Sequence, residues 1–112
     1  MVKLAKRNYN LFWHTLIVVL IVDSSERENE FIVCLLKHVG DDNTRLIERG
    51  ELYALAKAIG FSEREVYRYT MDLDLLGYLK ARPILGGKIA SLNFTARGVE
   101  YAKQLRADKK SL

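Results

Sequence analysis

The heptapeptide IGFSERE, which ends at Glu65, restricts how this chain can fold more than any other segment. Gly60 follows apolar residues at helical spacing, and glycine commonly ends a helix in the left-handed conformation. Ser62 and Glu65 then form the S-x-x-E pattern of a capping box, which begins a new helix. Because only two residues separate the helices, the chain must turn sharply between them. The sequence therefore predicts a helix-turn-helix pair over residues 50–60 and 62–76.

The second helix of this pair has two chemically different sides. Its inward stripe is expected to contain Val66, Tyr69, Thr70, Leu73 and Leu76. The side chains expected to point away from that stripe are those of Arg64, Glu65, Tyr67, Arg68 and Met71. Long hydrogen-bonding side chains thus gather in the N-terminal half, which a recognition helix places against base edges in the major groove. In the preceding helix, the residues expected to face inward at helical spacing are Leu52, Leu55, Ala56 and Ile59.

Residues 78–95, YLKARPILGGKIASLNFT, have the pattern of a β-hairpin that forms a wing beside the two helices. Gly86 and Gly87 can supply the positive φ values that a two-residue turn requires. Pro83 cannot donate a hydrogen bond to a neighbouring strand, so its strand is expected to lie at a sheet edge or to be bulged there.

Positive charge is concentrated on the hairpin and the C-terminal tail. The net charge of the chain is +4, and residues 62–112 hold ten Lys and Arg against six Asp and Glu. Period-two alternation puts Lys80 and Arg82 on one face of the hairpin, while Lys88 lies at its tip. This distribution favours a polyanion or an anionic membrane surface as a partner, with ordinary surface charge as the alternative.

Two further helices flank the central elements. A second S-x-x-E box, starting at Ser25, begins a helix expected over residues 25–39. A short strand is an option over residues 45–48, in the polar loop that follows. Thr95 is placed to cap a last helix over residues 96–109. The apolar residues expected to face inward in that helix are Val99, Ala102 and Leu105.

Residues 1–24 combine a basic start with an apolar run from Leu11 to Val22. No small-residue cleavage site follows the run, and it is shorter than the ~20 apolar residues of a spanning helix. Helix and strand both fit the run, because it is rich in β-branched residues. Its apolar side chains must be covered, and we expect a helix that is covered by dimerisation; packing against its own domain and a monotopic membrane anchor are the alternatives. The expected dimer contacts are Phe12, Trp13, Leu16, Val19, Leu20 and Cys34.

Catalytic and metal chemistry is not expected. Cys34 and His38 lie four residues apart, which is a spacing that can hold a metal, but zinc normally has three or four protein ligands and the only other histidine is His14. We interpret the pair as a small apolar side chain and a half-buried imidazole. The single cysteine indicates a reducing compartment, and an interchain Cys34 disulfide is a further hypothesis. No phosphate-binding loop or nucleophile elbow is present, so we expect no cofactor, no metal and no enzyme activity.

From about Glu26 to Leu105 the chain resembles the winged-helix DNA-binding domain, particularly the small archaeal and MarR-type transcription regulators. The resemblance is carried by SEREVYRYTMDLDLLGYL, by the Gly-Gly wing and by FTARGVEYA before the last helix. It implies an α+β, mostly helical fold: a winged helix-turn-helix with a two- or three-stranded wing and additional helices at both ends. It also implies DNA contacts from the recognition helix (Ser62, Arg64, Glu65, Tyr67 and Arg68) and from the wing (Lys80, Arg82 and Lys88).

We therefore expect an amino-terminal dimerisation element over residues 1–24 and a winged-helix domain over residues 25–112. The function implied is that of a cytoplasmic, homodimeric regulator that binds specific double-stranded DNA, with no small-molecule substrate and no membrane partner. The charge of residues 62–74 differs from that expected of a strong DNA-binding helix, because this segment holds two Arg against four acidic residues. A sequence-independent DNA-coating or architectural protein and a winged-helix protein-interaction module remain as alternatives.

Overall fold

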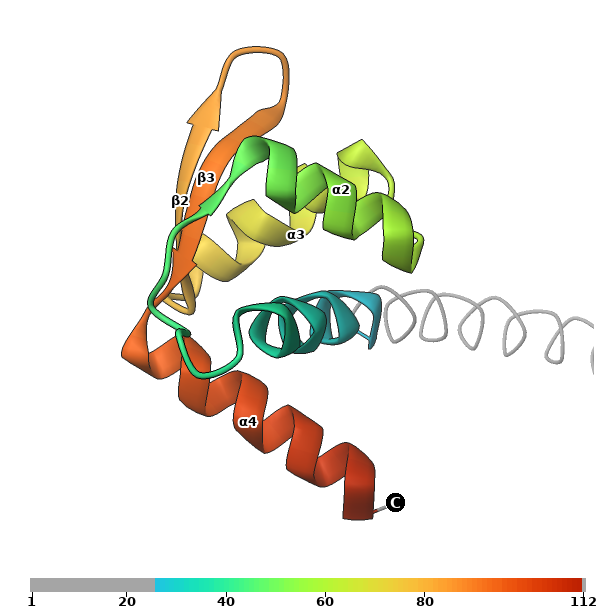
Figure 1. Ribbon diagram of the computed structural model, residues 1–112, viewed down its shortest axis with the longest axis vertical. Helices are drawn as coiled ribbons and strands as arrows, with labels where there is room; N and C mark the ends of the chain where they lie inside the picture. The colour runs from blue at the N-terminus through green and yellow to red at the C-terminus, as the bar shows by residue number, and fades with distance from the viewer. Residues whose placement is uncertain (1–25, 112) are drawn as a thin grey trace, which may run out of the picture. The chain divides into compact units, whose positions relative to one another are not determined.

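The structure of this protein is a computed structural model that describes residues 26–111, with side chains through Asp108. Its elements are a helix of residues 26–39, β1 (Ile47–Glu48), α2 (Arg49–Ile59), α3 (Glu63–Leu75), β2 (Leu79–Ile84), β3 (Lys88–Phe94) and α4 (Ala96–Ser111). The chain divides into two compact units, Met1–Glu30 and Phe31–Leu112. Figure 1 shows the hairpin of β2 and β3 extending beyond α2 at one end of the second unit.

The three strands form one antiparallel sheet in the order β1-β3-β2. The helix-turn-helix pair and the β2–β3 hairpin follow one another as the sequence predicts, and β1 adds a third strand. This arrangement is a winged helix-turn-helix, and the predicted α+β, mostly helical fold is confirmed. The dimerisation helix expected over residues 1–24 and the cap at Ser25 lie outside the described residues. Among the helices that the structure describes, none combines the length and the apolarity needed to cross a bilayer.

The turn between α2 and α3 is built from local hydrogen bonds and one buried aromatic ring. Gly60 adopts a left-handed φ of 90°, and the backbone N–H of Phe61 then donates to the carbonyl of Ala56 at 2.8 Å. The Phe61 ring is buried and makes edge contacts with Phe31 and Tyr69. Because the ring sits in the core, the turn has one favoured geometry and the angle between α2 and α3 is fixed.

The core-facing stripe of α3 matches the prediction except at its end. Val66, Tyr69, Thr70 and Leu73 are buried, but Leu76 is 52% exposed. The prediction for Leu76 is wrong because the helix ends at Leu75, so the following side chain leaves the stripe.

Two residues expected to point away from this stripe are also placed differently. Tyr67 and Met71 are half-buried and pack against the core cluster. They flank the buried stripe, so their long apolar parts cover its margin while their ends reach solvent.

The hairpin has an irregular, protected edge. Its loop is the three residues from Leu85 to Gly87, so the prediction of a two-residue turn is wrong by one, although both glycines have the expected positive φ. The pairing register shifts between Arg82 and Pro83, and β2 is an edge strand, so both alternatives predicted from the proline hold together.

Towards the base of the hairpin, the carboxylate of Asp74 accepts a hydrogen bond from the Ala81 N–H at 2.7 Å. This bond occupies a donor that an edge strand would otherwise present to another chain.

Candidate nucleic-acid interface

The first turn of α3 is held by a complete capping box. The Ser62 hydroxyl accepts a hydrogen bond from the Glu65 N–H at 3.1 Å, and a Glu65 carboxylate oxygen accepts one from the Ser62 N–H at 3.0 Å. The other Glu65 oxygen accepts a hydrogen bond from the Tyr69 hydroxyl at 3.2 Å. Ser62 and Glu65 therefore order the start of the helix, and both are engaged within the protein although the resemblance implies DNA contacts for them.

The solvent-facing side of α3 carries Arg64, Arg68 and Asp72, which follow one another at one-turn spacing and are all exposed. Leu75 lies seven residues after Arg68, so helical spacing puts it on the same side, and it is 86% exposed. Sequence periodicity missed Leu75 because it does not belong to the core-facing stripe. An exposed apolar side chain on such a face can contact a thymine methyl group, and arginine can bond guanine with two hydrogen bonds.

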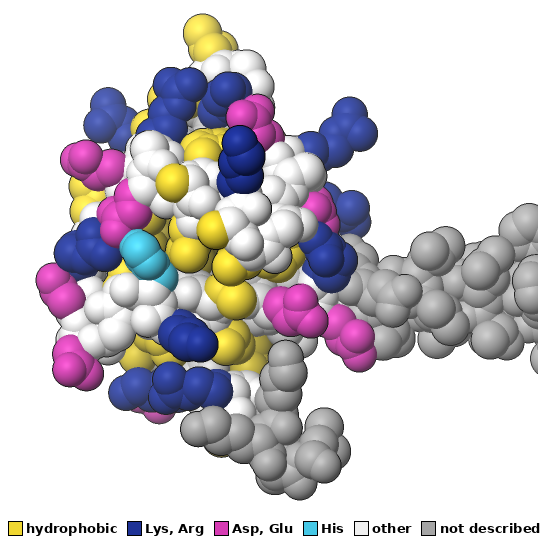
Figure 2. Space-filling view, turned by 45° about the vertical axis from the view of Figure 1, so that its right-hand side comes forward, with side chains coloured by type: hydrophobic (Ala, Val, Ile, Leu, Met, Phe, Trp, Pro, Cys, Tyr) yellow, Lys and Arg dark blue, Asp and Glu magenta, His cyan; other side chains and the backbone are white. Residues whose placement is uncertain are grey.

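The tip of the hairpin lies beside the beginning of α3. The Lys88 ammonium is 3.6 Å from the Glu63 carboxylate, in an exposed ion pair. This contact joins residues from the hairpin and from α3 that are far apart in the sequence. On the face shown in Figure 2, Lys and Arg side chains gather around the hairpin end at the top, with acidic side chains among them.

Lys80 and Arg82 occupy a different place from Lys88. Both are exposed, and they lie opposite Asn93 and Ser91 of β3 on the solvent side of the sheet. The side chains that alternate with them face the core cluster, against which α3 packs. The structure therefore brings Lys88 to the start of α3 but holds Lys80 and Arg82 on the sheet face that points away from the core. A shallow hollow of about 300 Å³ opens beside Arg82.

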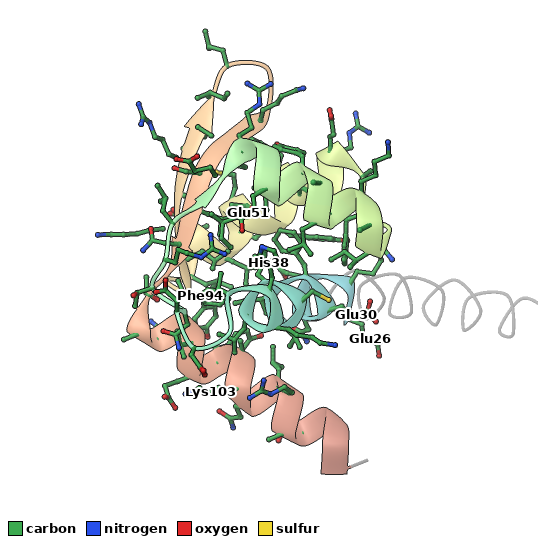
Figure 3. The ribbon with its side chains drawn as sticks, viewed as in Figure 1. Glu26, Glu30, His38, Glu51, Phe94 and Lys103 are labelled. Atoms are coloured by element: carbon green, nitrogen blue, oxygen red, sulfur yellow. The ribbon has the colours of Figure 1, made fainter. Side chains whose placement is uncertain are left out.

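One charged cluster could not be found from sequence spacing. Glu51 on α2 accepts two hydrogen bonds from the Arg45 guanidinium, at 3.0 and 2.8 Å, and lies 2.6 Å from Nε2 of His38. Figure 3 shows His38 and Glu51 pointing toward each other from their two helices. The hydrogen bonds from Arg45 and then His38 lower the pKa of Glu51 to about 2, and the bond to Glu51 raises the pKa of Arg45.

This cluster changes the interpretation of the Cys34 and His38 pair. His38 is engaged by a carboxylate, and Cys34 is half-buried on the same helix. Within residues 26–108, no group of three or more His, Cys, Asp or Glu side chains is placed to hold a metal ion. The cluster therefore ties the helix of residues 26–39 to α2 through the hydrogen bond between His38 and Glu51.

A second arrangement that sequence reasoning missed lies at the start of α4. The rings of Tyr78 and Tyr101 stack with centroids 4.0 Å apart and planes 1° from parallel, and the Arg97 guanidinium carbon is 5.1 Å from the Tyr78 centroid. An open hollow of about 480 Å³ borders these side chains. Stacking of this kind fastens α4 to the beginning of β2.

No protein-family model and no curated protein matches this chain. Among solved structures, the crystal structure of SSV1 F-93 is similar to it, with a TM-score of 0.47 and 23% sequence identity. The match covers 74% of this chain and 87% of that one. The winged-helix description therefore rests on the order and pairing of this chain's own elements.

Proposed function

We propose that this protein binds specific double-stranded DNA, with α3 in the major groove and the hairpin against the neighbouring backbone. The observation that carries the proposal is the pairing of Lys88 with Glu63, because it sets the cationic wing tip next to the exposed Arg64 and Arg68 face. In a winged helix these two surfaces act together: the helix reads base edges and the wing contacts phosphates.

The two arginines of α3 have the base-reading role. Arg64 and Arg68 each present a planar group that can donate two hydrogen bonds to one guanine. Tyr67 is half-buried, so only its outer part can reach a phosphate or a base. Lys88 neutralises a phosphate beside the helix. Lys80 and Arg82 contact phosphates of DNA that bends around the outer face of the sheet.

The charge balance of α3 limits how much it adds to affinity. Residues 62–74 hold two Arg against four acidic residues, so long-range attraction must come from the wing and from cations of α4 such as Lys103 and Arg106. This balance also favours one alternative, a sequence-independent DNA-coating protein in which the wing and tail supply nearly all the affinity. A protein-interaction module is the remaining alternative.

We further propose that the protein acts as a homodimeric, cytoplasmic transcription regulator of the small archaeal or MarR type, without a cofactor or catalytic site. The apolar side chains of residues 9–22 would form the dimer contact, including Phe12, Trp13, Leu16, Val19 and Leu20, with Cys34 beside the symmetry axis. Deletion of residues 1–22 should then yield monomers or aggregates in analytical ultracentrifugation. An unchanged dimer after the deletion would contradict this role for the segment, and equal migration on reducing and non-reducing denaturing gels would exclude the interchain Cys34 disulfide.

The decisive test of DNA recognition is selection from a random duplex library with the full chain. A homodimer should enrich a symmetric site whose half-sites are centred about one helical turn, ~34 Å, apart. A lack of any enriched sequence, together with strong binding to random DNA, would favour the DNA-coating alternative. Absence of binding to every duplex at low salt would reject DNA binding altogether.

The assigned roles of two cations can then be separated with the enriched site. Arg68→Ala should weaken binding to the specific site by about 1–3 kcal/mol and should change binding to random DNA much less. Lys88→Ala should weaken both duplexes equally and reduce the salt dependence, since it removes one phosphate contact. Identical losses for the two variants on both duplexes would contradict this division.

A further inference from the structure

The hairpin ends in an apolar side chain that nothing in the described part of the protein covers. Leu85 is 99% exposed, and Ile84 and Pro83 immediately before it are also exposed. A single exposed leucine is common on protein surfaces, but hairpin loops are normally polar. Here three successive apolar residues, the last two of β2 and the first of the loop, lie at the end of the hairpin.

The surroundings of this tip are cationic. Arg82 precedes the apolar residues on β2, and Lys88 follows them at the start of β3. Lys88 also places the base of the loop next to Glu63 at the exposed start of α3. Along the chain, Leu85 therefore lies between two cations, of which Lys88 is on the α3 side and Arg82 on the outer face of the sheet. This combination matches a nucleic-acid groove, where phosphates flank a stack of apolar base faces.

We propose that Leu85 is a wedge that enters the minor groove beside the α3 site and partly unstacks one base step, so that the duplex bends. The inference rests on the proposed DNA-binding function. Gly86 and Gly87 suit such an approach, because the absence of side chains after the wedge lets the backbone come close to the groove. Pyrimidine–purine steps such as TA unstack most easily and are the expected targets.

A membrane surface is less well matched by the same tip. Stable attachment to a bilayer needs more buried apolar area than one leucine supplies, or a second strong anchoring signal. DNA is matched better, because Arg64 and Arg68 of α3 are exposed on the helix whose start lies beside the hairpin. Vesicle binding is therefore a competing outcome of the test.

The test uses the full chain and duplexes of roughly 30 base pairs that carry 2-aminopurine beside a TA step and dyes at both ends. Wild-type protein should raise the 2-aminopurine fluorescence and shorten the distance between the ends. Leu85→Ala should lose both signals and bind DNA about ten-fold more weakly, because alanine lacks most of the apolar contact that leucine makes when it is buried in the groove. Leu85→Met should retain both signals. The matched control is Leu46→Ala, which removes a half-exposed leucine just before β1, outside the hairpin.

The outcomes separate this inference from the proposed function. Wild-type binding without unstacking, or unchanged signals in Leu85→Ala, would overturn the wedge while leaving DNA binding intact. Equal losses in Leu85→Ala and Leu46→Ala would also overturn it. If Leu85→Ala affects only binding to phosphatidylserine vesicles, the tip serves a membrane and the wedge is wrong. Failure of every variant to bind any duplex rejects the proposed function itself.

Discussion

Gly98 packs its α carbon directly against the backbone of Tyr78. A Cβ atom added at position 98 would overlap the Tyr78 carbonyl oxygen and lie 3.0 Å from the Tyr78 Cα. The same carbonyl accepts hydrogen bonds from the N–H and the hydroxyl of Thr95, and that hydroxyl also accepts one from the Gly98 N–H at 3.0 Å. The Thr-x-x-Gly pattern at the start of α4 therefore holds this helix against the residue before β2 through hydrogen bonds and close backbone packing.

Gly98→Ala should destabilise the protein by about 2–4 kcal/mol, because the added methyl group meets backbone rather than a flexible side chain. The free energy of unfolding in urea measures this change. Gly50→Ala is the matched control: a Cβ there meets nothing within 4 Å and the residue lies inside α2, so the change should be neutral or stabilise by about 0.4–1 kcal/mol. Similar losses in both variants would show that close packing at Gly98 is not the cause.

Asp74→Ala should expose the edge of β2. The Ala81 N–H loses its acceptor, at a cost of about 1 kcal/mol, and its amide should exchange with solvent faster. Asp74→Asn keeps a side-chain oxygen in place and should retain most of the protection. Hydrogen exchange followed by NMR tests this residue by residue. Unchanged exchange at Ala81 in Asp74→Ala would mean that the bond does not protect the edge.

Glu51→Gln should reduce stability at pH 7 by up to about 1 kcal/mol, since the cluster with Arg45 and His38 is half-exposed and screened by solvent. Because folding lowers the pKa of Glu51 from its ordinary 4.5 to about 2, its stabilisation is complete above pH 4.5 and is lost as the pH falls toward 2. The difference between wild type and variant should therefore shrink between pH 5 and pH 2 in urea titrations. A constant difference over that range would contradict the charge-based explanation.

Glu63→Gln should strengthen DNA binding by roughly two- to five-fold, because it removes a negative charge from the start of α3 and releases Lys88 for phosphate. The slope of log affinity against log salt should change by much less than the ~0.9 of a full phosphate contact, because Lys88 already contacts phosphate in the wild-type complex. Fluorescence anisotropy over a salt series measures both quantities. Glu100→Gln makes the same charge change on α4, and an equal effect of the two variants would show that only net charge matters.

The sequence by itself determined the local structure. The glycine that ends α2, the capping box of α3, the cap at Thr95 and the glycine-rich hairpin all depend on residues within about four positions of one another. Their order was enough to predict a winged helix-turn-helix and an exposed arginine face on α3.

Only the tertiary structure decided which distant groups meet. The bonds from Arg45 and His38 to Glu51, the ion pair of Lys88 with Glu63 and the packing of Gly98 on Tyr78 join separate elements. No spacing rule encodes them, because they depend on how helices and sheet pack over a shared core. For the same reason, alternation could put Lys80 and Arg82 on one face of the hairpin, but only the assembled fold showed that this face points away from the core.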